Sequence, residues 1–189
     1  RAIENKIQKA CFVPWKRSTD DRLFYPVCGF LLQRRIKNHV HHNRIPGNRA
    51  MNPLLHILST GTELSSGRST DTNGPYIARK FADCGFRIHG MSILPDNPAV
   101  LLETIREIAE KKEISGIVIT GGLGPTADDH TIDVLSELTG LPPVEDENAL
   151  RRLEIVAKRY AGRLRLQDAR RQVRILEGSK GVPNNSGLA

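Results

Sequence analysis

The amino-acid sequence predicts an α/β sandwich with a mostly parallel sheet. From residue 54 onward, short apolar runs alternate with amphipathic segments of helical period. Residues 116–120, GIVIT, are apolar at successive positions, which is typical of a central parallel strand buried on both faces. The length of 189 residues and the hydrophobic fraction of 39% suit one domain of ordinary size with an appendage.

The first half of this alternation contains two strands and a helix. Residues 54–60, LLHILST, form the first expected strand, which ends at Gly61 and a polar loop. A helix is expected over 72–84, because its apolar residues share one face and Gly85 follows where helices often end. The next strand is expected over 86–94, FRIHGMSIL.

The second half repeats the pattern. A helix is expected after Asn97, a good N-cap, with Pro98 in its first turn. Its buried stripe is formed by Leu101, Leu102, Ile105 and Ile108. The strand 116–120 follows, and then come helices expected over 129–138 and 147–160. Because ligands bind beyond the carboxyl ends of parallel strands, the loops after the first and third strands should face one crevice.

The positive charge is concentrated in one segment. Residues 1–50 contain 11 Lys and Arg against 3 Asp and Glu, and residues 51–189 contain 17 against 18. The net charge of +7 therefore belongs to the first segment, and nucleic acid is not expected as a partner of the domain. Prolines and a glycine interrupt the apolar pieces of this segment. We expect a basic, irregular and poorly ordered extension upstream of a domain that starts at Met51.

Composition also bears on the compartment. The three cysteines, Cys11, Cys28 and Cys84, are odd in number and form no CxxC pair. This pattern favours a reducing cytoplasm over a disulfide framework. No apolar run approaches the roughly 20 residues of a membrane helix. We therefore expect a cytoplasmic protein with no membrane partner.

The segment 121–131, GGLGPTADDHT, is the main candidate for chemistry. Its glycines let the backbone approach a ligand closely, and the amides of the following helix can hold an anion such as a phosphate. The loop has no lysine, so it is not a P-loop. The adjacent Asp128 and Asp129 can hold a divalent cation that bridges phosphate oxygens, or one of them can simply cap the helix. Both interpretations remain open.

The loop after the first strand carries similar groups. Asp71 can cap the next helix, whereas Glu63 follows the strand end without such a structural role. A carboxylate from each of two neighbouring strand ends is a reasonable arrangement for a metal site or a general base. The two loops together therefore predict a site that combines an anion with a cation or a base.

Three segments, STGTELSSGRSTDTN, GGLGPTADDHT and VPNNSGLA, together resemble the N-terminal domain of the CinA family, the competence/damage-inducible proteins. That domain is similar to the molybdopterin-binding fold of the MoaB and MogA proteins. The resemblance covers about 54–189 and implies a three-layer α/β/α sandwich. It also implies ADP-ribose pyrophosphatase activity, in which a divalent metal and water cleave the diphosphate to AMP and ribose 5-phosphate.

The resemblance also implies the site residues. Glu63, Asp128 and Asp129 match the catalytic and metal-holding positions. The substrate-binding positions are matched by Gly61, Asp71, Asn73, Gly121, Gly122, Gly124, Thr126 and Thr131. The expected cofactor is Mg²⁺, Mn²⁺ or Co²⁺, with a monovalent cation as an open addition. A homo-oligomer is expected, and the ligand is expected to be a small nucleotide or pterin.

The sequence departs from the family pattern at three places. The usual TGDEL reads TGTEL at 60–64, so one carboxylate is missing. The usual NxxQ reads ARRQ at 169–172. The usual GTAPG reads SGLA at 186–189, and the family has further strands after it. We therefore expect an incomplete domain, truncated at the C-terminus, with an exposed sheet edge. The amidase domain of many family members has no counterpart in the sequence, so its activity is not carried over.

Three functions remain open at this stage. The first is metal-dependent hydrolysis of a nucleotide-diphosphate sugar. The second is a binding module for a pterin, a molybdopterin or a nucleotide without hydrolysis, because fold alone does not choose between them. The third is an inactive fragment, or a chain whose basic extension binds nucleic acid.

Overall fold

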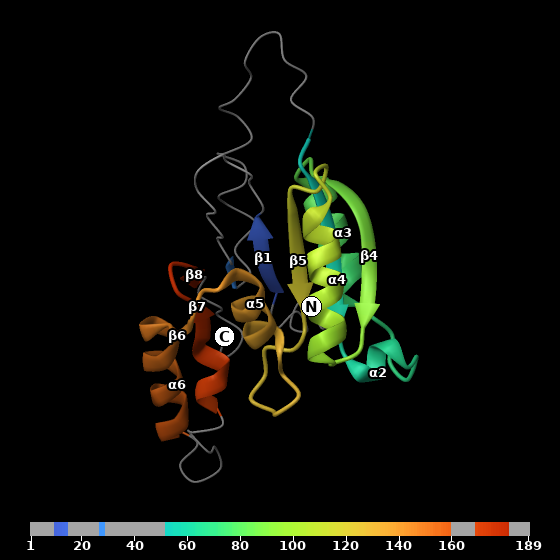
Figure 1. Ribbon diagram of the computed structural model, residues 1–189. Coiled ribbons are helices and arrows are strands. Elements are labelled where there is room, and N and C mark those ends of the chain that lie inside the picture. The colour runs from blue at the N-terminus through green and yellow to red at the C-terminus, as the bar shows by residue number, and fades with distance from the viewer. Residues whose placement is uncertain (1–9, 15–26, 29–51, 160–168, 182–189) are drawn as a thin grey trace.

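The computed structural model describes residues 10–14, 27–28, 52–159 and 169–181. Its elements in chain order are β1 (Ala10–Pro14), β2 (Val27–Cys28), β3 (Leu54–Thr60), α2 (Thr62–Ser65), α3 (Asn73–Asp83), β4 (Arg87–Leu94), α4 (Pro98–Glu110), β5 (Gly116–Thr120), α5 (Thr131–Thr139), β6 (Pro143–Glu145), α6 (Glu147–Arg159), the 3₁₀ helix η1 (Arg170–Val173), β7 (Arg174–Leu176) and β8 (Lys180–Gly181). Figure 1 shows their arrangement. No helix in these described ranges is both long and apolar enough to cross a membrane.

Among the described residues, the main sheet has six strands in the order β4-β3-β5-β1-β2-β8. The central strand β3 pairs in parallel with β4 on one side and with β5 on the other. A separate two-stranded sheet is formed by β6 and β7, which are antiparallel. The predicted fold class is therefore confirmed, since the sheet around β3 is parallel and helices cover it.

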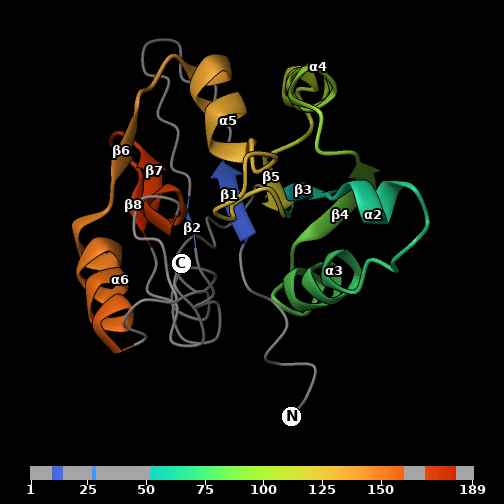
Figure 2. The same ribbon diagram turned by 90° about the horizontal axis from the view of Figure 1, so that it is seen from below.

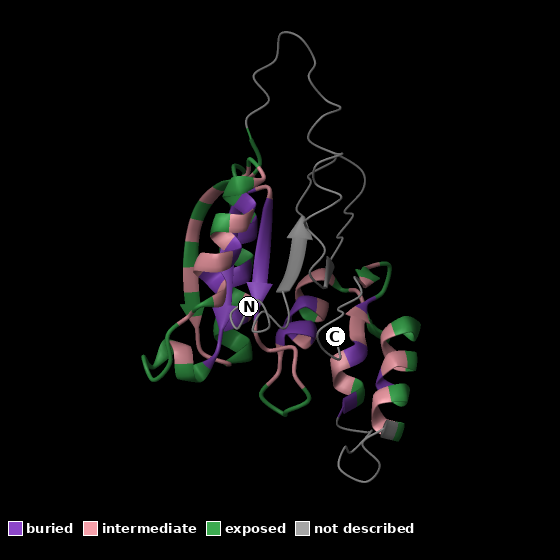
Figure 3. Ribbon diagram, turned by 180° about the vertical axis from the view of Figure 1, so that it is seen from behind, coloured by how far each residue is buried: buried purple, intermediate pink, exposed green. Residues whose placement is uncertain are grey.

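The helices form two layers around this sheet, with α4 and α5 on one side and α3 on the other (Figure 2). One apolar cluster joins α4 and α5 to Leu58 and Ile119, and a second joins α3 to Ile57 and Val118. Every residue of β5 is buried (Figure 3). The apolar run GIVIT thus lies between two helix layers, as a central parallel strand should.

Most helix boundaries agree with the predictions from sequence. The Asn97 side chain accepts hydrogen bonds from the amides of Ala99 and Val100 at 3.0 and 3.2 Å, so it caps α4. Gly140 follows α5 in the left-handed conformation, at φ 72°. The last predicted helix is α6, which ends at Arg159, and residue 160 of the prediction lies outside the described residues.

One helix begins later than the sequence predicts. We expected a helix from Asp129, but α5 begins at Thr131. The reason is a turn before it, in which the Asp129 amide donates to the Thr126 carbonyl at 3.2 Å. The Asp129 carboxylate in turn accepts from the Thr126 amide at 2.8 Å, so this residue closes the turn instead of starting the helix.

Two strands come from the segment that we expected to be irregular. β1 pairs with β5 in antiparallel register from Ala10 opposite Thr120 to Pro14 opposite Gly116, and β2 pairs with β1. The expectation of irregular structure is therefore wrong for these two strands, because their backbone groups find partners in the sheet. The remainder of 1–50 lies outside the described residues, and the domain boundary at Met51 stays a prediction.

Candidate functional site

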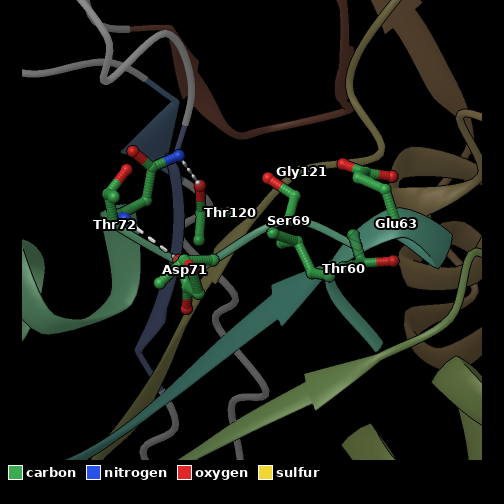
Figure 4. A pocket seen from close by; sticks show the side chains of 10 residues that line it. Thr60, Glu63, Ser69, Asp71, Thr72, Thr120 and Gly121 are labelled. Carbon is green, nitrogen blue, oxygen red and sulfur yellow. Dashed lines mark hydrogen bonds between the residues drawn. The ribbon is translucent and has the colours of Figure 1, made fainter. Parts of the chain in front are cut away.

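The site lies where the loops after β3 and β5 meet. Because the two strands are adjacent and parallel, their carboxyl ends open at the same edge of the sheet. A pocket of about 250 Å³ lies between the loops (Figure 4). It is lined by Thr60, Glu63, Leu64, Ser69, Thr70, Asp71, Thr72, Asn73, Thr120 and Gly121.

The β3 loop brings Glu63 to this pocket. The strand ends at the buried Thr60, and the chain turns at once into the short helix α2, whose second residue is Glu63. The Glu63 side chain is exposed, and no described residue donates a hydrogen bond to its carboxylate. The carboxylate is therefore available to a ligand.

A residue that the sequence analysis missed, Asp96, fixes the start of α2. Its carboxylate accepts a hydrogen bond from the Thr60 hydroxyl at 2.8 Å and another from the Thr62 amide at 2.8 Å. The Thr62 hydroxyl lies 3.3 Å from the same carboxylate. Asp96 follows β4, so a neighbouring strand end holds the β3 loop in place. Thr62, which replaces an acidic residue of the family pattern, donates to a carboxylate here.

Asp71 has a structural task at the start of α3. One carboxylate oxygen accepts from the amides of Asn73 and Gly74 at 2.9 and 3.0 Å, and the other accepts from the Ser59 hydroxyl at 2.6 Å. The helix-capping role considered from sequence is thus confirmed. The Asn73 side-chain amide reaches across to the Thr120 hydroxyl at 3.4 Å and connects the two strand ends.

The first glycines of the β5 loop are required by close packing. Gly121 has φ 100°, and a Cβ atom there would collide with the carbonyl oxygen of Thr60. A Cβ atom at Gly122 would collide with the Thr131 hydroxyl, which itself donates to the Gly121 carbonyl at 2.9 Å. Thr131 is 1% exposed, so this predicted substrate-binding residue supports the loop from inside. Close approach of the β3 strand end therefore explains the glycine at 121, and close packing of Thr131 explains the glycine at 122.

The acidic end of the glycine loop is not part of the pocket lining. Asp129 binds the Thr126 amide and hydroxyl, and a Cβ atom at Gly124 would collide with its carboxylate. Asp128 is exposed. Among the described residues there is no group of three His, Cys, Asp or Glu side chains that could hold a metal ion. The three carboxylates of Glu63, Asp128 and Asp129 therefore do not form a preformed metal site.

A metal ion that arrives with a ligand needs fewer protein carboxylates than such a site. Mg²⁺ is commonly held by one or two carboxylates together with the phosphates of a substrate. Glu63 and Asp128 are the exposed carboxylates on the two loops, so each is able to contribute one oxygen ligand. The predicted metal role of Glu63, Asp128 and Asp129 stays a prediction.

A second residue from outside the motif, Arg171, holds the far end of the glycine loop. Its Nη2 donates to the Asp129 carbonyl at 3.2 Å and lies 3.3 Å from the Asp133 carboxylate in α5. Arg174 binds the same carboxylate with two hydrogen bonds, at 2.8 and 3.2 Å. This pair of arginines connects η1 and β7 to the start of α5.

The strand β3 also carries a buried histidine. The His56 ring is 6% exposed, and its Nδ1 lies 3.0 Å from Nδ1 of His89 while its Nε2 lies 2.9 Å from the Ser92 hydroxyl. Burial, followed by the nearby charges of His89 and Lys111, lowers the pKa of His56 from 6.5 to about 4. At neutral pH the ring is uncharged and joins β3 to β4.

Of the residues predicted for the site, the pocket brings together Glu63, Asp71, Asn73 and Gly121. It does not include the predicted residues Gly61, Gly122, Gly124, Thr126, Asp128, Asp129 and Thr131. The sequence analysis missed the lining residues Thr60, Leu64, Ser69, Thr70, Thr72 and Thr120. The only sequence signal for most of them was the density of hydroxyl side chains in the β3 loop.

Comparison with known proteins identifies the family of the segment that contains both loops of the site. Residues 56–184 match the family described as "Probable molybdopterin binding domain". A CinA-like protein of Leptospira interrogans is 40% identical over 142 residues, which cover 72% of this chain and 34% of that protein. A putative competence-damage inducible protein of Oceanobacillus iheyensis is 34% identical over 133 residues, covering 70% and 31%. The chain thus spans about a third of the length of the curated relatives it matches.

A solved structure supports the fold. The crystal structure of the protein CinA from Thermoplasma acidophilum superimposes with a TM-score of 0.61 at 23% identity, covering 73% of this chain and 79% of that chain. At this level of identity the likeness concerns the arrangement of helices and strands.

Proposed function

Because this chain belongs to the molybdopterin-binding domain family, and within it to the CinA-like proteins, we propose that it binds a nucleotide-diphosphate sugar and hydrolyses the diphosphate. The ligand class is that of ADP-ribose, and the products are AMP and ribose 5-phosphate. The observation that carries the proposal is an unpaired carboxylate, Glu63, that shares a pocket with the first glycine of the β5 loop.

Residues of the two loops can be assigned to the steps of this reaction. Water attacks one phosphorus atom, the bridging P–O bond breaks, and the proton of the water passes to a base. Glu63 is proposed to accept that proton, and its exposed position in the pocket lining beyond the strand end supports this role. The backbone of Gly121 and Gly122 offers an approach free of side chains to the phosphates.

A divalent metal, when bound, supplies positive charge that neutralises the diphosphate. Glu63 and Asp128 are the residues proposed to hold it, each through an exposed carboxylate. Asp129 is proposed to keep the loop in shape through its hydrogen bonds to Thr126. Of the three carboxylates, Asp129 is therefore not proposed as a metal ligand.

The direct test is incubation of the 189-residue chain with ADP-ribose and Mg²⁺, Mn²⁺ or Co²⁺, followed by chromatography for AMP and ribose 5-phosphate. We expect Glu63→Gln to reduce the rate by about 100-fold or more, since it removes a base. The matched control is Glu147→Gln, at an exposed glutamate that pairs with Arg151 on α6. Absence of AMP with all three metals, in a folded protein, would exclude hydrolysis.

The family description favours a second candidate, a pterin-binding module without hydrolysis. In that case molybdopterin binds to the chain, ADP-ribose is not cleaved, and Glu63→Gln leaves pterin affinity within about two-fold. Measuring both ligands on the same preparation separates the two candidates.

A further inference from the structure

We propose that the pocket between the β3 and β5 loops takes the second ribose of the ligand, the one distal to the adenosine, through its vicinal hydroxyls, while the phosphates stay outside, over the glycine loop. This inference rests on the proposed function and assigns the two ends of its ligand to different parts of the site. It also makes the sugar, and not only the diphosphate, a determinant of recognition.

The chemistry of the pocket wall carries the inference. Its polar side chains are five hydroxyls, one amide and two carboxylates, contributed by Thr60, Ser69, Thr70, Thr72, Thr120, Asn73, Glu63 and Asp71. None of the ten described lining residues is Lys, Arg or His. A phosphate placed here would be desolvated beside carboxylates without a cationic partner, which is costly. A sugar hydroxyl both donates and accepts hydrogen bonds, so it suits such a wall.

The free hydrogen-bonding groups point to the same ligand. Asp71 is already occupied by the amides of Asn73 and Gly74 and by the Ser59 hydroxyl, and the Thr60 hydroxyl donates to Asp96. Among the described lining residues, the Glu63 carboxylate has no hydrogen-bond donor, so one of its oxygens can accept from a sugar hydroxyl while the other stays available for its role in hydrolysis. A carboxylate accepts a hydrogen bond from a ribose hydroxyl in dinucleotide-binding folds.

Size and layout agree with one sugar ring. The volume of about 250 Å³ is below the roughly 300–1,000 Å³ of pockets that enclose a drug-sized ligand. Figure 4 shows Glu63 towards one end of the row of side chains and Thr72 towards the other, with Thr120 and Gly121 between them. Gly121 is the only glycine in the lining, so the pocket meets the glycine loop at this residue.

Arg68, the basic residue nearest in sequence on the β3 loop, does not add a cationic side chain to the pocket lining. Its Nε donates to the Ser66 hydroxyl at 3.1 Å, and it is not one of the lining residues. The rival arrangement brings a phosphate into the pocket on the cation that Glu63 is proposed to hold, instead of leaving it over the glycine loop. That alternative predicts that the affinity for a phosphate end rises with added metal, whereas a sugar contact does not need the metal.

The test compares ADP-ribose with ADP, which lacks the second sugar, by calorimetry on the full chain without added metal. We expect ADP-ribose to bind about ten-fold more tightly, because the hydroxyls of its second ribose use groups that ADP leaves unpaired. Thr72→Val should lower the affinity for ADP-ribose several-fold and leave that for ADP unchanged. The control, Ser65→Ala, alters an exposed hydroxyl that donates to the Thr62 carbonyl and is not part of the lining.

Equal affinity for ADP and ADP-ribose overturns the inference, and so does an affinity for ADP that reaches that for ADP-ribose when Mg²⁺ is added. Either result leaves the proposed function intact if AMP still forms in the hydrolysis assay. Failure of both nucleotides to bind, with no AMP formed, removes the proposed function together with the inference.

Discussion

Acid should weaken this fold through His56. The ring is buried between β3 and β4, with a folded-state pKa of about 4 against an ordinary value of 6.5. The unfolded chain therefore takes up a proton at a higher pH than the folded chain does. The stability that the neutral ring confers is fully present above about pH 6.5 and is lost as the pH falls towards 4. The direction is thus destabilisation by acid.

The size of the effect follows from the two pKa values. At pH 5 most of the unfolded histidine is charged and most of the folded histidine is neutral. The difference amounts to about 2 kcal/mol of unfolding free energy relative to pH 7.5. In a domain of this length that corresponds to a decrease of about 4–8 °C in melting temperature at pH 5.

The assay is urea unfolding at pH 7.5 and pH 5 of the wild type, His56→Gln and His130→Gln. The loss of stability between the two pH values should be about 2 kcal/mol smaller in His56→Gln than in the wild type. His130→Gln, which alters a partly exposed histidine before α5, should behave as the wild type does. Equal losses in His56→Gln and the wild type would refute the assignment of the acid sensitivity to this ring.

Two further predictions concern the loops of the site. Gly121→Ala should destabilise the fold by about 3 kcal/mol or more, whereas Gly67→Ala, at φ 74° with open space around it, should cost about 1 kcal/mol. Urea unfolding of both variants checks this, and similar losses would contradict the packing explanation. Asp96→Ala should cost about 2 kcal/mol and speed amide exchange at Thr62, because the start of α2 loses its acceptor. Asp83→Ala, at an exposed aspartate, is the matched control, and equal exchange at Thr62 in both variants would count against the role of Asp96.

The elements that the sequence predicted correctly are those with strong local signals. GIVIT is apolar on both faces, and Asn97 with Pro98 has the pattern of a helix start, so β5 and α4 lie where they were expected. The start of α5 was misplaced because two adjacent aspartates and a threonine offered competing turns. Which of them closes a turn depends on the packing of Gly124 against Asp129, and no residue pattern shows that contact.

The position of the site could be predicted from the sequence, but most of the residues that line the pocket could not. Parallel strand ends bring Glu63 and Gly121 together, because the topology follows from the alternation of strands and helices. Asp96 and Arg171 come from other elements and reach the loops through side chains, so only the folded chain reveals them. Thr131 resembled a ligand contact in the sequence, yet it is buried beneath the loop.

The antiparallel pairing of β1 with β5 has a consequence for the order of folding. Residue 10 of the chain pairs with residue 120, so this contact joins segments that are far apart in sequence. Closing so long a loop costs conformational entropy, and the stabilising contact forms only once the loop has closed. Non-local strand pairing is slow for that reason. We expect β3, β4 and β5 to assemble first and β1 to join afterwards. In the interval the outer edge of β5, directly before Gly121, is open to pairing with other chains.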